Sequence, residues 1–218
     1  MDTTPILVML SRRACLARAF LVLLLTLPSS VVLAAPAPSE AVLEAITALR
    51  GQLEGLRGDG AEPSQPQVVD TVREVVLPRV DVEMAARLVL GRHWRDATDA
   101  QRQAFIDAER DLLLRLYAAH ALDYLDAEVE VVATQVAPDG QRSGVRTRVS
   151  RPGKPEVSVD YQLRLANDEW KVFDAVVNGV SAIITLRNAI GEDISRFGLD
   201  GTITRLREKL SEVQTPAS

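Results

Sequence analysis

Apolar residues recur at helical spacing near the start of this 218-residue chain. Between Ala41 and Leu56 they fall at every third or fourth position, a period that predicts an amphipathic helix with a narrow apolar stripe. Residues 58–67, GDGAEPSQPQ, have the composition of a flexible linker. The first helix is therefore either an appendage joined by this linker or an element that packs on the main domain, and the pattern leaves both alternatives open.

Stop and start signals mark two short helices further along. A helix over Val68–Leu77 has to stop before Pro78, because proline lacks an amide hydrogen and clashes with the preceding turn. Asp81 stands where an N-cap belongs, ahead of a helix over Val82–Leu90. Gly91 follows as its stop, since glycine readily adopts the conformation that ends many helices.

The longest predicted helix begins at a capping box. In this arrangement the Thr98 side chain accepts from one free amide and Gln101 reaches back to accept from another. The helix extends to about Tyr124, and Glu109 intrudes on its apolar face. The other members of that face are Phe105, Leu112, Leu113, Leu116 and Tyr117.

The pattern then changes to alternation of apolar and polar residues, which is typical of strands with one buried face. The strand candidates, joined by short turns, are Val129–Val136, Gly144–Ser150, Val157–Leu165 and Trp170–Val177. They predict an antiparallel four-stranded meander. Helices follow at Ser181–Ile190 and Thr202–Leu210. Helices, then a sheet, then helices around one core give an α+β fold.

Residues 1–34 have the pattern of a secretory signal peptide. Arg12, Arg13 and Arg18 precede the apolar run Ala19–Leu27, and small residues suitable for cleavage follow. A membrane anchor is the alternative, but a proline and two serines interrupt the run short of the roughly 20 apolar residues of a span. Export by the general secretory or the twin-arginine route stays open.

This signal divides the chain into four parts and makes the mature protein an exported domain. The expected parts are a signal peptide (1–34), an N-terminal helix with its linker (35–67), a main domain (68–212) and a short tail (213–218).

Charge and cysteine content restrict the classes of function. The net charge is −5, and removing the arginine-rich signal makes the chain more acidic, which argues against nucleic acid as a partner. The single cysteine, Cys15, lies within the signal, so the mature chain has neither a disulfide nor thiol chemistry. Aromatic residues make up only 4% of the chain, so slim aliphatic side chains line the space between the helices and the sheet.

Candidate chemistry is sparse. The two histidines, His93 and His120, belong to no recognisable metal or catalytic motif, and Ser181 stands at a helix start, where serine is usually a cap. We therefore expect no catalytic residue, no metal ligand and no cofactor, and not an enzyme. The apolar faces either close into an ordinary core or hold a pocket for an apolar ligand, and composition leaves both open.

Two long segments resemble the MlaC family, also known as the toluene-tolerance family. They are EVVLPRVDVEMAARLVLGRHWRDATDAQRQAFIDAERDLLLRLYAAHAL (residues 74–122) and WKVFDAVVNGVSAIITLRNAI (residues 170–190). The resemblance extends over about residues 68–210. The chain departs from the family at Leu186, where tyrosine is usual, at Ile190, where phenylalanine is usual, and at Ala108-Glu109, which replaces a glutamate–phenylalanine pair.

The resemblance implies a fold and a cargo. The family fold is a curved antiparallel sheet packed by helices, related to the nuclear-transport-factor-like and cystatin-like class, with an apolar cavity between helix and sheet. We expect Trp94 and the helix from Thr98 to form one wall, and Arg187 to attract a lipid phosphate. The side chains expected to line the path of the lipid tails are Leu88, Phe105, Leu113, Leu116, Tyr117, Tyr161, Leu163, Val177, Val180, Ile183 and Ile184.

The resemblance also implies partners and a location. The family member is a periplasmic carrier that exchanges phospholipid between an inner-membrane ABC transporter complex, which contains an MCE-domain protein, and an outer-membrane lipoprotein complex. This exchange maintains the lipid asymmetry of the outer membrane. The alternative is an adaptor of the same fold that acts in an envelope complex with no bound lipid.

Overall fold

The computed structural model describes residues 36–57 and 62–212, all of which belong to one compact unit within Ala34–Ser218. The predicted signal peptide, the beginning of the linker and the tail lie outside the described residues. In the described part, no helix is long and apolar enough to cross a membrane.

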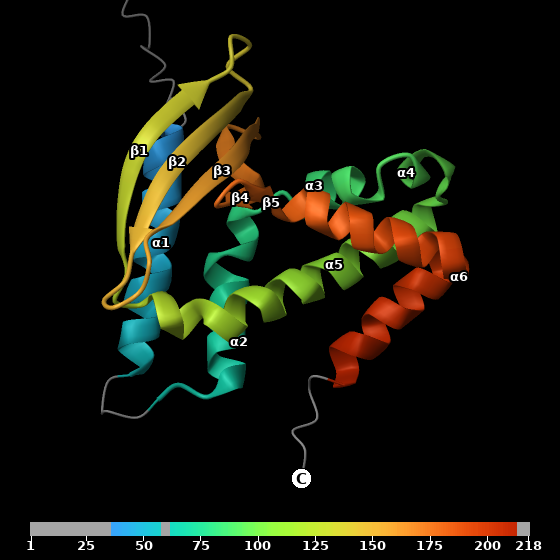
Figure 1. Cartoon of the computed structure of the whole chain (residues 1–218), viewed down its shortest axis with the longest axis horizontal. Coiled ribbons are helices and arrows are strands. Elements are labelled where there is room, and N and C mark those ends of the chain that lie inside the picture. The colour runs from blue at the N-terminus through green and yellow to red at the C-terminus, as the bar shows by residue number, and fades with distance from the viewer. Residues whose placement is uncertain (1–35, 58–61, 213–218) are drawn as a thin grey trace, which may run out of the picture. The chain divides into compact units, whose positions relative to one another are not determined.

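The order of elements follows the sequence pattern (Figure 1). The helices before the sheet are α1 (Pro38–Leu56), α2 (Gln65–Val75), η1 (Leu77–Arg79), α3 (Val82–Leu90), α4 (His93–Asp96), α5 (Asp99–His120) and η2 (Ala121–Tyr124). The strands are β1 (Glu128–Val136), β2 (Arg142–Ser150), β3 (Val157–Ala166), β4 (Glu169–Val177) and β5 (Val180–Ser181), and α6 (Ala182–Glu212) ends the fold. The short helix α4 was not predicted.

The sheet is an antiparallel meander with the order β1-β2-β3-β4-β5. The prediction of four strands was therefore wrong by one short strand. Val180 and Ser181 pair with the end of β4 before α6 begins, because Asn178 (φ 48°) and Gly179 (φ 84°) turn the chain back tightly enough for this pairing. The two-residue strand is too short to show a period in the sequence.

The two faces of the sheet differ as the alternation predicts. On β2, the side chains of Val145, Thr147 and Val149 are buried on the face that the helices cover. Arg146 and Arg148 point to the opposite side and form ion pairs there, Arg146 with Asp160 and Arg148 with two glutamates. The solvated arginine face predicted for this strand is confirmed.

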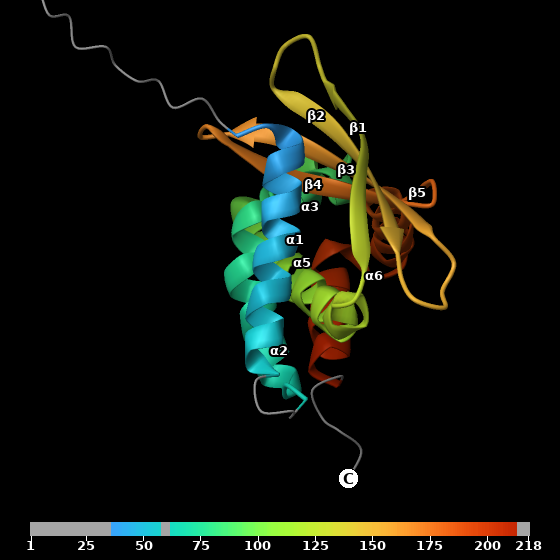
Figure 2. The ribbon, with the colours of Figure 1, turned by 90° about the vertical axis from the view of Figure 1, so that its left-hand side faces the viewer.

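Helix α1 is part of the main unit. It runs alongside β1 and β2 (Figures 1 and 2), where Val42 packs with Val145 and Leu163. At its other end Leu53 is buried against Val68 and Val72 of α2. Of the two alternatives for this helix, the structure shows the packed one.

Helix starts and stops follow the predicted chemistry. The Asp81 carboxylate accepts from the Met84 amide at 3.0 Å and also pairs with Arg164 of β3, so this N-cap ties α3 to the sheet. Thr98 and Gln101 form the expected capping box of α5. The region predicted as two helices after the sheet is α6, which bends where Gly198 adopts φ 69°, a conformation that favours glycine.

Candidate functional site

Five of the expected site residues pack in the core or against it. Phe105 and Ile183 are buried in a cluster shared by α3, α5 and α6, and Leu88 and Trp94 pack against the same cluster. Leu163 is buried between the sheet and α1. The three buried side chains stabilise the fold and offer no surface to a ligand in this conformation.

The other expected apolar residues, apart from Ile184, lie on α5 and on the sheet, and four of them are largely exposed. We call Leu113, Leu116, Tyr117, Tyr161, Val177 and Val180 the open apolar surface. Leu116, Tyr117, Val177 and Val180 are between 40% and 62% exposed. A closed core buries nearly all of such side chains, so this surface remains open to solvent or to a ligand.

Tyrosines show that α5 and the sheet face each other across this surface. Burial raises the pKa of Tyr161 on β3 to about 12, with further contributions from Tyr117 of α5 and Tyr124 of η2. Burial also raises the pKa of Tyr117, and the charge of Asp174 on β4 adds to this effect. Tyr117 nevertheless keeps 40% of its surface exposed.

The packing of the backbone explains why this surface stays open. Helix α5 packs mainly on α2, α3 and α6, whereas the sheet packs mainly on α1, α3 and α6. The helices beside α5 thus hold it across from the sheet. The members of the open apolar surface are aliphatic residues and tyrosines, which suits hydrocarbon.

Glu109 lies on α5 between the buried cluster that contains Phe105 and the open apolar surface. It follows Phe105 by one helical turn and precedes Leu113 by another. The side chain is 2% exposed, and neither carboxylate oxygen has a hydrogen-bond partner. Burial alone raises its pKa from 4.5 to about 8. This carboxyl is therefore largely protonated at neutral pH and does not place a charge beside the apolar surface.

Arg187 lies where α6 meets the end of α3, and its role toward a lipid phosphate stays a prediction. Its Nε donates to the Leu88 carbonyl oxygen at 2.7 Å, and it lines a pocket of about 670 Å³ between the end of α3 and α6, together with His93 and Glu192. None of the tyrosines lines this pocket. Ile184 is 57% exposed. It lies one helical turn before residues of α6 that line the same pocket, so its place on the lipid path stays a prediction.

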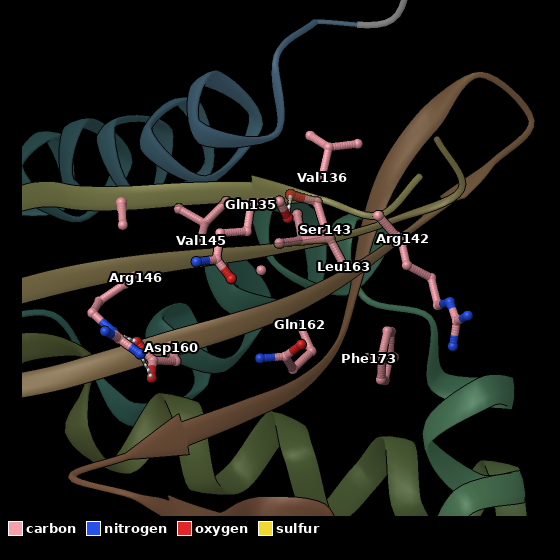
Figure 3. Close-up of a pocket in the computed structure, with 13 residues that line it drawn as sticks. Gln135, Val136, Arg142, Ser143, Val145, Arg146, Asp160, Gln162, Leu163 and Phe173 are labelled. Carbon is pink, nitrogen blue, oxygen red and sulfur yellow. Dashed lines mark hydrogen bonds and ion pairs between the residues drawn. The ribbon is translucent and has the colours of Figure 1, made fainter. Parts of the chain in front are cut away.

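A second pocket, of about 460 Å³, lies over β1 to β4 (Figure 3). Arg146 and Asp160, which form an ion pair at 2.7 Å, line it together with Gln162, Arg142 and Phe173. Such a lining is too polar for an acyl chain, because burying these groups against hydrocarbon would leave hydrogen-bonding groups without partners. The open apolar surface is therefore the better candidate for an apolar ligand.

The Ser181 and His120 side chains, which were considered for catalysis, contact neighbouring side chains of the fold. The Ser181 hydroxyl donates to Asp174 at 2.7 Å and accepts from the Ile184 amide at 3.1 Å, so it caps α6 as predicted. His120 lies near Asp123 at the exposed end of α5. Within the described ranges, no group of histidine, cysteine and carboxylate side chains could hold a metal ion.

Two residues of this region were not predicted from the sequence. Tyr124 lies two helical turns after Tyr117, a spacing that places both on one face, but the predicted helix ended there. Arg151 directly follows β2, where the alternation has ended, so no pattern in the sequence assigns its side chain to a face. Its guanidinium lies over the Tyr124 ring, 4.4 Å from the ring centre.

Comparisons with known proteins agree on one family. The family model described as MlaC protein matches residues 51–208 of the chain. The intermembrane phospholipid transport system binding protein MlaC of Haemophilus influenzae is 27% identical over 145 residues, which are 65% of this chain and 67% of that protein. The toluene tolerance protein ttg2D of Pseudomonas putida is 28% identical over 191 residues, or 86% of this chain and 87% of that protein.

A solved structure has the same fold. The phospholipid-binding protein from Ralstonia solanacearum, determined in complex with a phospholipid, superimposes with a TM-score of 0.70 and 27% sequence identity. The match covers 84% of this chain and 99% of the Ralstonia protein. It includes both the sheet and the helices, and it confirms the predicted α+β arrangement.

Proposed function

This chain belongs to the MlaC family, and from that premise we propose that it is a phospholipid carrier of the periplasm. The open apolar surface between α5 and the sheet would hold the acyl chains, and the headgroup would remain near the rim. The observation that carries the proposal is the exposure of Leu116, Tyr117, Val177 and Val180 on elements that face each other. The phospholipid bound to the Ralstonia relative supports it.

The physical need for such a carrier is the cost of exposing hydrocarbon to water. A chain of about sixteen carbons costs on the order of 10 kcal/mol to expose, at ~0.8 kcal/mol for each methylene. A diacyl lipid therefore does not cross an aqueous compartment unaided at a useful rate. A protein that buries both chains against aliphatic side chains removes this cost, and it needs no nucleotide and no cofactor, because the lipid is cargo.

We place the carrier between two membrane complexes. The name of the Haemophilus relative describes a binding protein of an intermembrane phospholipid transport system. By analogy, the partners are an inner-membrane ABC transporter complex with an MCE-domain protein and an outer-membrane lipoprotein complex. The role would be to maintain the lipid asymmetry of the outer membrane. In this proposal the chain is not an enzyme and leaves the ester bonds of its cargo intact.

Native mass spectrometry of the full chain, expressed with its leader and purified without detergent, tests the proposal. We expect the added mass of one intact diacyl phospholipid for each chain, released on denaturation. A protein without lipid, in a sample that is folded by circular dichroism, would favour the adaptor alternative. Recovery of lysolipid or free fatty acid in place of intact phospholipid would favour an enzyme.

A further inference from the structure

Arg151 differs from the other arginines of the sheet. Arg142, Arg146, Arg148 and Arg164 each pair with a carboxylate. Among the described residues, no carboxylate pairs with Arg151, and its Nε is buried without a hydrogen-bond partner. The Nε itself is enclosed by the protein, so a partner from outside the chain would meet the terminal Nη groups of a guanidinium that no described carboxylate neutralises.

The position of Arg151 connects it to the open apolar surface. It directly follows the last residue of β2, and its guanidinium lies 4.4 Å from the centre of the Tyr124 ring. Tyr124 also adds to the raised pKa of Tyr161, a member of the open apolar surface, so the two rings lie near each other. The turn between β2 and β3 lies near the C-terminal end of α5 (Figure 1), and Arg151 reaches the Tyr124 ring there.

The chemistry of this pair suits a phosphate group. A guanidinium presents a planar set of donors that matches two oxygens of a phosphate, and stacking on an aromatic ring fixes its orientation. A cation beside exposed aliphatic side chains also matches a molecule that is anionic at one end and apolar at the other. No other described arginine combines a missing carboxylate partner with contact to these tyrosines.

We propose that Arg151, held over Tyr124, binds the phosphate of the cargo lipid and sets the position of the headgroup at the rim of the open apolar surface. This inference rests on the proposed carrier function and adds to it the group that recognises the polar end of the cargo. The expectation that Arg187 attracts the phosphate stays a prediction; its Nε donates to the Leu88 carbonyl oxygen, and it lines the pocket of about 670 Å³.

Lipid loading of two variants tests this assignment. Arg151→Gln removes the charge and keeps a polar side chain, and Arg142→Gln is the matched control, because Arg142 lies at the other end of β2 and pairs with Asp139. Each protein is incubated with vesicles that contain either phosphatidylglycerol or a diacylglycerol with the same acyl chains. Native mass spectrometry then gives the fraction of protein that carries lipid.

We expect Arg151→Gln to weaken phosphatidylglycerol binding roughly 10- to 100-fold, the range for loss of a hydrogen bond to a charged group, while diacylglycerol binding stays at the wild-type level. Arg142→Gln should leave both unchanged. Equal loss of both lipids, or loss of neither, in Arg151→Gln would overturn the assignment. Failure of the wild type to take up either lipid would instead refute the carrier function.

Inorganic phosphate at millimolar concentration separates the two sources of a phosphate group. If the site serves the lipid headgroup, calorimetry shows no binding of inorganic phosphate to the lipid-loaded wild type, because the site is occupied. If lipid-loaded protein binds inorganic phosphate and Arg151→Gln abolishes that binding, the ligand is a free anion and the headgroup assignment is wrong.

Discussion

Replacing Glu109 by glutamine should change how the stability of the protein depends on pH. The Glu109 carboxyl is 2% exposed, has no hydrogen-bond partner, and has a pKa raised by burial from 4.5 to about 8. The folded chain therefore binds this proton more tightly than the unfolded chain. Glutamine has nearly the same shape and stays neutral at every pH, so the variant lacks this linkage.

The direction and size of the effect follow from the two pKa values. Below pH 4.5 the carboxyl is protonated in both states, and the stabilising effect of the tighter proton binding is fully present. As the pH rises from 4.5 to about 8, the unfolded chain loses the proton before the folded chain does, so the free energy of unfolding falls. The raised pKa corresponds to roughly 5 kcal/mol in total, lost by the time the pH is well above 8.

Urea unfolding at pH 5, 7 and 9 measures the effect. Relative to the wild type, Glu109→Gln should be several kcal/mol more stable at pH 9, with the difference shrinking toward pH 5. Asp111→Asn, at an exposed carboxylate of the same helix, is the control and should follow the wild-type curve. If the difference in the free energy of unfolding between the wild type and Glu109→Gln is the same at all three pH values, the reasoning is wrong.

Three further changes test the packing and the site. Val177→Asp, at an exposed position, should abolish lipid retention while the fold survives, because an unpaired carboxylate against acyl chains costs several kcal/mol. If native mass spectrometry still detects lipid on this variant, Val177 is not part of the site. Asp81→Ala, which deletes a helix cap and leaves Arg164 unpaired, should lower the free energy of unfolding by about 2–3 kcal/mol in urea, and an unchanged value would contradict the cap. Leu53→Ala should cost about 2–5 kcal/mol in the same assay if α1 belongs to the core, and almost nothing if α1 is an appendage.

Local signals in the sequence predict the elements well. Asp81 and Thr98 cap helices as expected, because the cap depends only on residues within one turn. The alternation along β2 correctly separates Val145 from Arg146. The missed strand β5 has two residues, so no period could reveal it.

The division of the apolar residues between core and open surface could not be predicted. Periodicity tells which face of α5 is apolar, but Phe105 and Leu116 share this face and differ entirely in burial. What distinguishes them is the packing around each: Phe105 is buried against residues of α3 and α6, whereas Leu116 is 49% exposed. That difference arises from long-range packing, which the pattern of one segment does not contain.

The contact between Arg151 and Tyr124 also arises from long-range packing and could not be predicted from the sequence. The two residues lie 27 positions apart, on a strand end and a 3₁₀ turn that come together only when the sheet folds onto α5. In the sequence, Arg151 is one of several arginines near the sheet, and only the structure shows that the others have carboxylate partners.

Photo-crosslinking from within the lipid-loaded protein tests the binding surface most directly. Benzoylphenylalanine at Tyr117, on the open apolar surface, is compared with the same residue at Phe197, an aromatic residue of similar exposure on α6. After irradiation, mass spectrometry should find a covalent acyl-chain adduct at position 117 and none at position 197. A lipid-loaded protein that gives no adduct at 117, or equal adducts at both positions, would contradict the claim that hydrocarbon binds between α5 and the sheet.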